Sequence, residues 1–210
     1  MTNSDDDTTP VAVADAYMAN SDPLSVPAPG VVQNDTDMDG DAIIAILESG
    51  PITGSLSLNL DGSFVYTPTT SFNGMDVFSY RASDGTNNSQ PVEVEIVVDQ
   101  VDPTVDWVSP VGTGQTIFVT NEILVLSATA SDNLAVDRVR FRRWDAVNMH
   151  YVELGEVFNP PYSVTLDTST LNYAFNQINV DAYDTAGNLS ERKFIWLYRE
   201  AKLYLPMVIR

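Results

Sequence analysis

Residues 58–64 read Leu58-Asn59-Leu60-Asp61-Gly62-Ser63-Phe64, which places an Asp-Gly pair between short β-forming runs. This arrangement is a strong sequence signal for a β-hairpin, because glycine readily adopts the positive φ that tight hairpin turns require. Strands are therefore predicted on both sides of the turn, over residues 55–60 and 63–67. The hairpin makes an all-β fold the first expectation for the sequence around it.

Short apolar runs alternate with turn residues through most of the chain, and no stretch keeps a helical period. The remaining predicted strands lie at 11–17, 42–48, 76–82 and 92–98 in the first half, and at 104–108, 122–130, 137–143, 151–153, 162–166, 177–183 and 193–198 in the second. Two such sets, separated by turns rich in Asn, Asp, Gly and Pro, are typical of two β-sandwiches in tandem.

The charge of the chain is very unevenly distributed. Its 210 residues carry a formal charge of −19, and residues 1–102 hold seventeen acids and one base while residues 103–210 hold twelve acids and nine bases. Such a negative field disfavours nucleic acid and anionic membranes and favours cations or basic protein surfaces. The sequence also lacks a glycine-rich phosphate loop and a continuous apolar run long enough to span a membrane.

Cysteine is absent, so neither disulfides nor thiolate metal sites are possible. With His150 as the only imidazole, zinc is not expected. The first seven residues have neither the basic nor the apolar region of a signal peptide, so such a peptide is expected to be missing or already removed. No serine or cysteine nucleophile motif accompanies His150, and no pair of acids is placed for glycoside hydrolysis, so the sequence predicts no enzyme activity.

An acidic loop, Asn34-Asp35-Thr36-Asp37-Met38-Asp39-Gly40-Asp41, precedes the predicted strand at 42–48. Calcium takes about six to eight oxygen ligands, and carboxylates at alternating positions before a glycine turn can converge on one ion. An EF-hand is excluded, because Ile46 occupies the position of its bidentate glutamate. The predicted Ca²⁺ ligands of this loop are Asp35, Asp37, Asp39 and Asp41. The alternative is a solvated acidic turn between two strands.

Several motifs of the first half form a wider pattern with the acidic loop. They are Pro10-Val11-Ala12-Val13-Ala14-Asp15-Ala16-Tyr17, Asn59-Leu60-Asp61-Gly62-Ser63-Phe64-Val65-Tyr66-Thr67-Pro68, Phe72-Asn73-Gly74-Met75-Asp76-Val77-Phe78-Ser79-Tyr80 and Ala82-Ser83-Asp84-Gly85. Over residues 10–98 the pattern resembles the bacterial cadherin-like repeat of large calcium-dependent surface adhesins. Asp15 and Asp84 are expected beside the acidic loop as further ligands. The acidic stretch that these repeats often carry is here Asn20-Ser21-Asp22-Pro23, with a single carboxylate.

The second half is similar to a bacterial Ig-like domain through four motifs. They are Ala130-Ser131-Asp132-Asn133, Val136-Asp137-Arg138-Val139-Arg140-Phe141, Pro161-Tyr162-Ser163-Val164-Thr165-Leu166-Asp167 and Asp184-Thr185-Ala186-Gly187-Asn188. Between the halves, residues 96–103 are similar to calcium-binding cadherin linkers, which implies that Asp99 and Asp102 stiffen the connection. Asp132, Asp184 and Asn188 are candidate ligands at the same place, and the alternative is that they cap their own turns.

The expected fold class is therefore all-β, with two tandem Ig-like or cadherin-like β-sandwiches of Greek-key topology. The expected organisation is an acidic N-terminal arm (1–9), a cadherin-like sandwich (10–100), a bacterial Ig-like sandwich (101–200) and an apolar C-terminal tail (201–210). The tail is either a last strand or similar to short attachment signals of secreted bacterial proteins.

Two side-chain patterns in the second half have plain structural explanations as well as functional ones. Arg138, Arg140 and Arg142 fall on one face of the strand at 137–143, as a solvated face or as a contact for an acidic neighbour. Trp107, Trp144 and Trp196 are expected in the core or at the seam, and the sequence indicates no aromatic platform.

The function that these features favour is an extracellular or cell-surface, non-enzymatic stalk or adhesin fragment made rigid by Ca²⁺. Its expected partners are other copies of itself or neighbouring repeats of a larger surface protein, and a cell-surface or matrix ligand, with no nucleic acid and no membrane span. One alternative is a filament subunit in which residues 9–18 or 203–209 add as a strand to the next copy. Another is a non-catalytic accessory region of a secreted polysaccharide-degrading enzyme.

Overall fold

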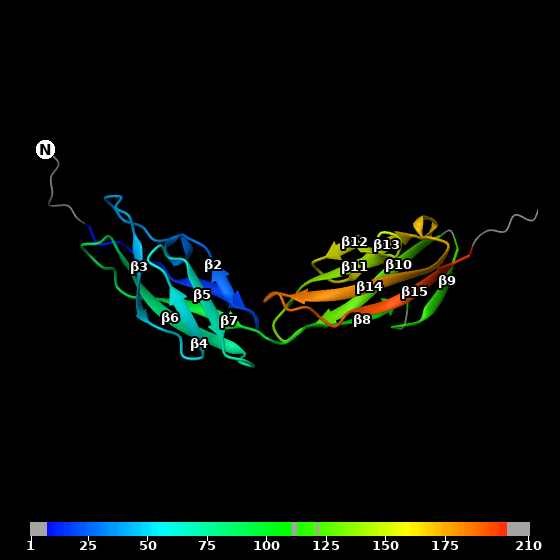
Figure 1. Cartoon of the computed structure of the whole chain (residues 1–210), viewed down its shortest axis with the longest axis horizontal. Helices are drawn as coiled ribbons and strands as arrows, with labels where there is room; N and C mark the ends of the chain where they lie inside the picture. Colours follow the sequence, from blue (N-terminus) through cyan, green and yellow to red (C-terminus); the bar gives the residue numbers. More distant parts are fainter. Residues whose placement is uncertain (1–7, 111–112, 121, 201–210) are drawn as a thin grey trace, which may run out of the picture. The chain divides into compact units, whose positions relative to one another are not determined.

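The computed structural model describes residues 8–110, 113–120 and 122–200. The chain divides into two compact units, Met1–Gln100 and Val101–Arg210, and Figure 1 labels most of their strands. Apart from two short 3-10 turns, the regular structure of the described residues is β, so the predicted all-β fold class is confirmed. The predicted C-terminal tail and residues 1–7 of the predicted N-terminal arm lie outside the described residues. No helix in the described part is long and apolar enough to cross a membrane.

Unit 1 is a sandwich of a four-stranded and a three-stranded sheet, with strand orders β1-β7-β6-β3 and β2-β5-β4. Its elements are β1 (Asp15–Ala19), β2 (Leu24–Val26), the 3-10 turn η1 (Gly30–Val32), β3 (Ile44–Ser49), β4 (Gly54–Leu58), β5 (Phe64–Pro68), β6 (Gly74–Ser83) and β7 (Val92–Val98). The β1 strand runs parallel to β7, whereas the other pairs are antiparallel. Alternate residues of β5 and β6 point inward, and Phe64, Tyr66, Phe78 and Tyr80 are at most 1% exposed.

The Asp-Gly hairpin of the sequence connects β4 and β5. Gly62 has a φ of +81°, and a Cβ atom there would lie 2.0 Å from the carbonyl oxygen of Pro29. The Gly62 carbonyl in turn accepts a hydrogen bond from the amide of Val31. The turn therefore needs glycine both for its backbone conformation and for the close approach of η1.

The first strand of unit 1 differs from its prediction. The sequence predicted a strand over residues 11–17, but β1 begins at Asp15, and Val11 makes only an isolated bridge to Thr36. That bridge, with hydrogen bonds of 2.8 and 3.1 Å, pairs the segment before β1 with the acidic loop. The pairing partner of this segment is thus a loop, which the apolar alternation alone could not indicate.

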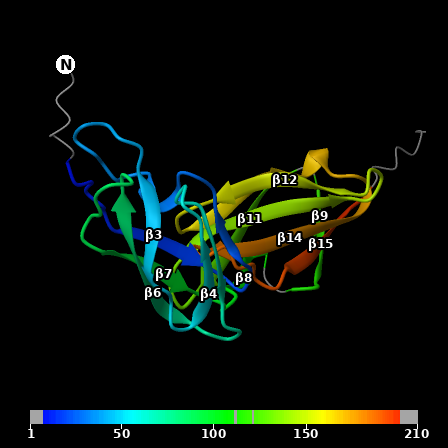
Figure 2. The ribbon, with the colours of Figure 1, turned by 60° about the vertical axis from the view of Figure 1, so that its left-hand side comes forward.

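Unit 2 is a sandwich of a five-stranded sheet, β12-β11-β14-β15-β9, and a three-stranded sheet, β13-β10-β8. Figure 2 shows the strands of the larger sheet side by side. The elements are β8 (Thr104–Ser109), β9 (Thr116–Val119), β10 (Ile123–Ser131), β11 (Val136–Asp145), β12 (His150–Val157), β13 (Tyr162–Asp167), the 3-10 turn η2 (Thr168–Thr170), β14 (Ala174–Asp184) and β15 (Lys193–Arg199). The strand β9 runs parallel to β15, while the other pairs of this sheet are antiparallel.

The core of unit 2 lies between these two sheets. Phe141, Ile178, Val180, Ile195 and Leu197 of the larger sheet are fully buried. They pack with Leu126 and Trp107 of the smaller sheet in one cluster, and the Trp107 and Phe141 ring centroids are 5.8 Å apart. Trp107 is thus a core residue, as predicted, but Trp144 and Trp196 alternate with inward residues and lie on the other face of the larger sheet.

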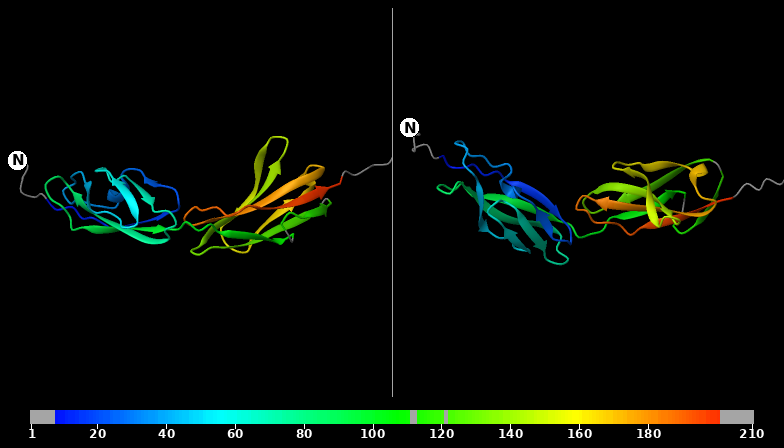
Figure 3. Two further views of the ribbon diagram at one scale, coloured as in Figure 1. Left: turned by 60° about the horizontal axis from the view of Figure 1, so that its bottom comes forward. Right: turned by 45° about the horizontal axis from the view of Figure 1, so that its top comes forward.

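The three arginines of β11 also lie on that outward face, but not as a merely solvated surface. Asp181 of the neighbouring β14 is fully buried, and its carboxylate accepts bonds from Arg140 (3.2 Å), Arg142 and Arg192 (3.3 Å). Arg140 and Arg142 thus contact an acidic neighbour, Asp181, within their own sheet. Figure 3 shows β11 and β12 as one hairpin that carries part of this face.

Candidate metal centre

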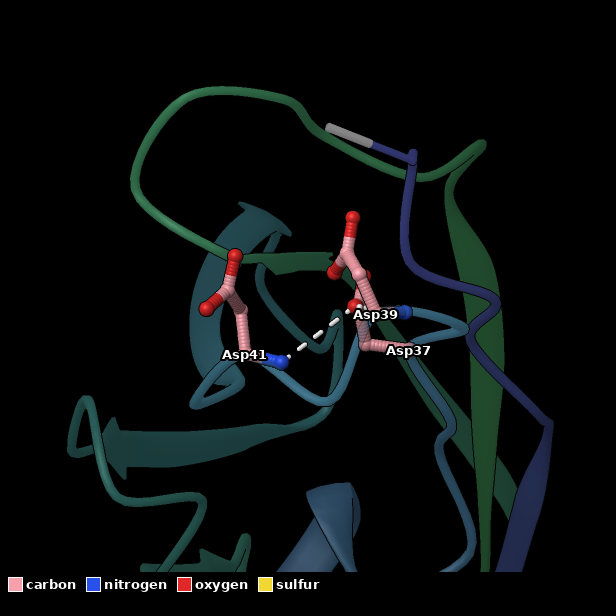
Figure 4. Close-up of side chains that lie close together, drawn as sticks. All are labelled: Asp37, Asp39 and Asp41. Atoms are coloured by element: carbon pink, nitrogen blue, oxygen red, sulfur yellow. Dashed lines mark hydrogen bonds between the residues drawn. The ribbon is translucent and has the colours of Figure 1, made fainter. Parts of the chain in front are cut away.

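Three carboxylates of the acidic loop come together between η1 and β3. One oxygen from each of Asp37, Asp39 and Asp41 lies within 4.8 Å of the others. Figure 4 shows their side chains around the bend of the loop. Gly40, within this bend, has a φ of +87°, a conformation that L side chains rarely adopt. The i, i+2, i+4 spacing and the glycine together gather the carboxylates.

Asp37 organises the loop and leaves one oxygen without a donor. Its Oδ1 accepts bonds from the backbone amides of Asp39 (3.1 Å), Gly40 (3.2 Å) and Asp41 (3.3 Å). Its Oδ2 is shielded from solvent and has no hydrogen-bond partner among the described residues. A buried carboxylate oxygen without a partner is unfavourable, and a bound cation would satisfy it.

The electrostatics of the trio indicate mutual repulsion. Contact with the carboxyl of Asp39 raises the pKa of Asp37, and the shared interaction lowers the pKa of Asp39. Asp39 is further held by Thr8, whose amide and hydroxyl donate to its Oδ2 at 2.8 and 3.2 Å. Two adjacent carboxylates repel each other when both are ionised, and a divalent cation would relieve that repulsion.

Asp35 points to a different part of unit 1. Its Oδ1 accepts from the Val13 amide (2.8 Å), and both carboxylate oxygens lie 3.0 Å from the buried hydroxyl of Tyr80. Asn34 donates to Asp15 Oδ1 at 3.1 Å, while Asp15 Oδ2 is buried without a partner among the described residues. The acidic side chains therefore form two groups. One is the trio, and the other combines Asp15 of β1 with Asn34 and Asp35 of the loop.

Burial raises the pKa of Asp15 to about 6, and the nearby charge of Asp35 adds to this effect. Burial also raises the pKa of Asp35. A carboxyl whose pKa is raised on folding contributes stability that is fully present below its unfolded pKa, near 3.8. That contribution is lost as the pH rises through about 6. At neutral pH without a cation, the ionised Asp15 therefore opposes folding.

The Asp15→Asn substitution is expected to stabilise the chain in chelator at pH 7.5. Asparagine keeps the acceptor for Asn34 but carries no charge, and we expect a gain of about 1–2 kcal/mol, reduced from the full shift because the site is partly solvated. Urea denaturation of both proteins at pH 5 and pH 7.5 measures the effect. A variant no more stable than the parent at pH 7.5 would show that the Asp15 charge is already compensated.

Asp84 lies in the turn between β6 and β7 and caps that turn. Its Oδ1 accepts from the amides of Thr86 and Asn87, both at 2.6 Å, and its Oδ2 is buried without a partner among the described residues. Asp84 therefore resembles Asp15, since each has one buried carboxylate oxygen without a partner among the described residues. No cluster of three metal-ligating groups among the described residues joins Asp84 to the trio.

Unit 2 gathers its candidate ligands at the loops that follow β10 and β14. Oxygens of Asp132 and Asp184 lie within 4.8 Å of each other. Asp184 is held by Asn188, whose amide and side chain donate to it at 2.9 and 2.7 Å, and the Asn188 side chain also reaches the Val101 carbonyl at 3.3 Å. Asp132 Oδ2 accepts from the Leu134 amide, and its buried Oδ1 has no donor among the described residues. Both functions considered for these residues, turn capping and metal ligation, are compatible with this geometry.

The two linker acids stand in different surroundings. The amide of Asp99 donates to the Ala19 carbonyl at 2.9 Å, which continues the pairing of β1 and β7 by one residue. Asp102, within unit 2, is exposed. Their predicted role in stiffening the connection stays a prediction.

The trio fits a hard cation by the nature of its donors. Its three carboxylates supply oxygen alone, and calcium accepts six to eight oxygens in flexible geometry, with water completing the shell. Nitrogen and sulfur ligands, which zinc prefers, are lacking in the trio. If calcium binds here, Asp37, Asp39 and Asp41 would hold it.

Some site residues were not predictable from spacing. Thr8 and Tyr80 contact the acidic loop from segments 31 and 45 residues away. In the sequence, Tyr80 is one of the inward residues of an alternating strand. Nothing in that pattern predicts that its hydroxyl contacts Asp35. The bonds of Tyr80 explain why Asp35 turns away from the trio.

Two family models match this chain. Residues 6–97 and residues 103–186 match two different family models, each described as a bacterial Ig domain. No curated protein matches the chain.

One solved structure of similar length has the same fold. The fibronectin(III)-like modules of Clostridium thermocellum CbhA match with a TM-score of 0.51 and 17% identity, over 95% of this chain and 96% of theirs. Weaker matches include an endo-β-1,4-mannanase from Thermotoga petrophila, with a TM-score of 0.35 and 15% identity over 49% of this chain and 21% of that one. The Yersinia pseudotuberculosis adhesin InvE matches with a TM-score of 0.30 and 12% identity, over 90% and 58%. At these identities the likeness concerns the fold alone.

Proposed function

Because residues 6–97 and 103–186 match models of bacterial Ig domains, we propose that the chain is an extracellular structural or adhesive module, a stalk or adhesin fragment, whose first domain is made rigid by calcium. Domains of this kind are typically non-catalytic parts of surface proteins. The cadherin-like resemblance of residues 10–98 belongs to the same proposal.

Two observations carry the calcium proposal: the Asp37, Asp39 and Asp41 carboxylates are gathered together, and Oδ2 of Asp37 has no donor among the described residues. Three negative groups at this separation repel one another, and a divalent cation turns that repulsion into attraction. The loop links η1 to β3, and the segment before β1 is bonded to it through Thr8 and Val11. Binding would thus fix three separate segments at one end of unit 1.

A second calcium site at the start of unit 2 is part of the proposal. Asp132 and Asp184 are brought together there, and Asp102 of the same unit precedes β8. We propose that these acids share an ion, with Asn188 holding Asp184 in place. A role of Asp99, and a stiffer connection between the domains, stay predictions from the sequence.

The Asp37→Asn and Asp39→Asn variants are expected to weaken calcium binding by about tenfold or more each, because calcium affinity depends on the number of charged ligands. Asparagine keeps an acceptor for the backbone amides of the loop, so the loop conformation is preserved. The matched control is Asp61→Asn, in the β4–β5 hairpin, where Asp61 accepts bonds from the amide and hydroxyl of Ser63. Titration calorimetry of the three variants gives the affinities. Equal affinities in all three would place the ion elsewhere.

A further inference from the structure

The outward face of β14, β15 and β9 in unit 2 carries a continuous row of aromatic rings. Register places Phe175 beside Tyr198, and Tyr198 beside Phe118. Phe194 and Trp196 continue the row along β15, since alternate residues of a strand share a face. We call these five residues, Phe118, Phe175, Phe194, Trp196 and Tyr198, the aromatic strip. Figures 2 and 3 show the three strands that carry it.

Consecutive rings of the strip are in contact. The centroid separations are 5.4 Å for Phe118 and Tyr198, 5.0 Å for Tyr198 and Phe175, 6.1 Å for Phe175 and Trp196, and 6.1 Å for Trp196 and Phe194. Phe118 is nevertheless 70% exposed and Phe175 is 60% exposed. Rings that are ordered by their neighbours and still open to solvent are unfavourable in water, and such a patch marks an interaction site.

Uncharged polar side chains flank the strip. Thr116 of β9 and Gln177 of β14 are both paired with Trp196, one on each side. The Gln177 amide donates to Asn179 Oδ1 at 3.2 Å, so its orientation is fixed. The resulting surface combines apolar ring faces with hydroxyl and amide groups, the composition of sites that recognise ligands with both apolar faces and hydroxyls.

The charge of the residues in and beside the strip indicates which kind of ligand the strip can bind. None of the five strip residues, nor Thr116 or Gln177, is charged. A charged ligand packed on this lining would lose hydration without gaining a partner of opposite charge. A neutral ligand avoids that cost.

From this surface we infer that the aromatic strip binds a neutral polysaccharide. The C–H faces of pyranose rings are apolar and pack against aromatic rings, and their hydroxyls can bond to Gln177 and Thr116. Consecutive strip rings lie at 62–85° to each other, so the surface is ridged and not flat. A ridged surface suits a single soluble chain, which can follow it, better than the flat face of a crystalline polymer. This inference is independent of calcium binding, since the strip shares no residue with the proposed ion sites.

The test is affinity electrophoresis and calorimetry of the 210-residue chain with soluble glucomannan and mixed-linkage β-glucan. Polygalacturonate and microcrystalline cellulose serve as the charged and the crystalline comparison. We expect binding to a soluble neutral polymer, and a loss of affinity of about tenfold or more in Phe175→Ala and Phe118→Ala. Both side chains are largely exposed, so these variants should fold. The matched control is Phe158→Ala, a phenylalanine 56% exposed in the loop between β12 and β13.

Several results would overturn the inference. They are an absence of binding to both soluble neutral polymers, preferential binding to polygalacturonate or to cellulose, and equal losses in the Phe158 variant. Sedimentation at several protein concentrations completes the test. A dimer that the Phe175→Ala change dissociates would identify the strip as an interface between copies and would also overturn the inference.

Discussion

Replacing Asp181 by alanine is expected to destabilise unit 2 by about 3–5 kcal/mol, because the change leaves buried positive charge without its partner. The Asp181 carboxylate is fully buried and contacts three guanidinium groups, those of Arg140, Arg142 and Arg192. Arg140 and Arg142 have side chains only 19% and 13% exposed, so water cannot replace the lost carboxylate. Burial alone would lower the pKa of Arg140, and the neighbouring charge of Asp181 outweighs that effect, so removing Asp181 takes away a main source of stabilisation of this guanidinium.

Urea denaturation followed by tryptophan fluorescence measures this loss in unit 2 alone, since Trp107, Trp144 and Trp196 all lie there. The matched control is Glu191→Ala, which removes an acid 83% exposed from its 2.8 Å pair with Lys193. Exposed pairs of this kind contribute about 0–1 kcal/mol. If the two variants lose the same small amount, the arginine cluster is held by packing and not by Asp181.

Calcium is expected to raise the melting temperature of the chain. A ligand that binds only the folded state stabilises it by about 2.7 kcal/mol at a hundred times its dissociation constant. Here the ion would also remove the repulsion among Asp37, Asp39 and Asp41, which opposes folding in its absence. Magnesium should stabilise less, because it prefers strict octahedral geometry and retains its water.

Differential scanning calorimetry in calcium, in magnesium and in chelator at matched ionic strength separates these effects. Matching the ionic strength matters because salt alone screens the acidic residues of unit 1. Equal melting temperatures in calcium and in chelator would contradict the calcium proposal, and equal shifts with both cations would indicate charge screening in place of a site.

The strands of this protein were largely predictable where apolar alternation extends over five or more residues. The predicted strand at 92–98 coincides with β7, and the Asp-Gly turn placed the β4–β5 hairpin. The strands β2 and β9 were missed, because three or four residues are too few to display a period of two. Both are edge strands, and their pairing is decided by residues distant in sequence.

The missed strand β9 also concealed the aromatic strip. Phe118 belongs to β9. Phe175 is near the start of β14 and lies two residues before the strand predicted from the sequence. The strip therefore joins rings from segments up to 80 residues apart, a juxtaposition that only pairing with β15 creates. For this reason the sequence indicated no aromatic platform.

Within the acidic loop, local spacing predicted the trio but not the orientation of Asp35. Asp37, Asp39 and Asp41 approach one another because a glycine turn and alternate spacing suffice to gather them. Asp35 is drawn to the buried hydroxyl of Tyr80 and the amide of Val13, both outside the loop. Such tertiary contacts have no local sequence signal, and they divide the predicted ligands into two groups.

Calorimetric titration of the whole chain with calcium tests the central claim most directly, because it gives the stoichiometry and affinity together. The account predicts saturable binding of at least one ion per chain, which Asp37→Asn weakens and Asp61→Asn leaves unchanged. A second ion would correspond to the site proposed at Asp132 and Asp184. Absence of saturable binding at millimolar calcium would contradict the claim and leave the acidic loop as a solvated turn.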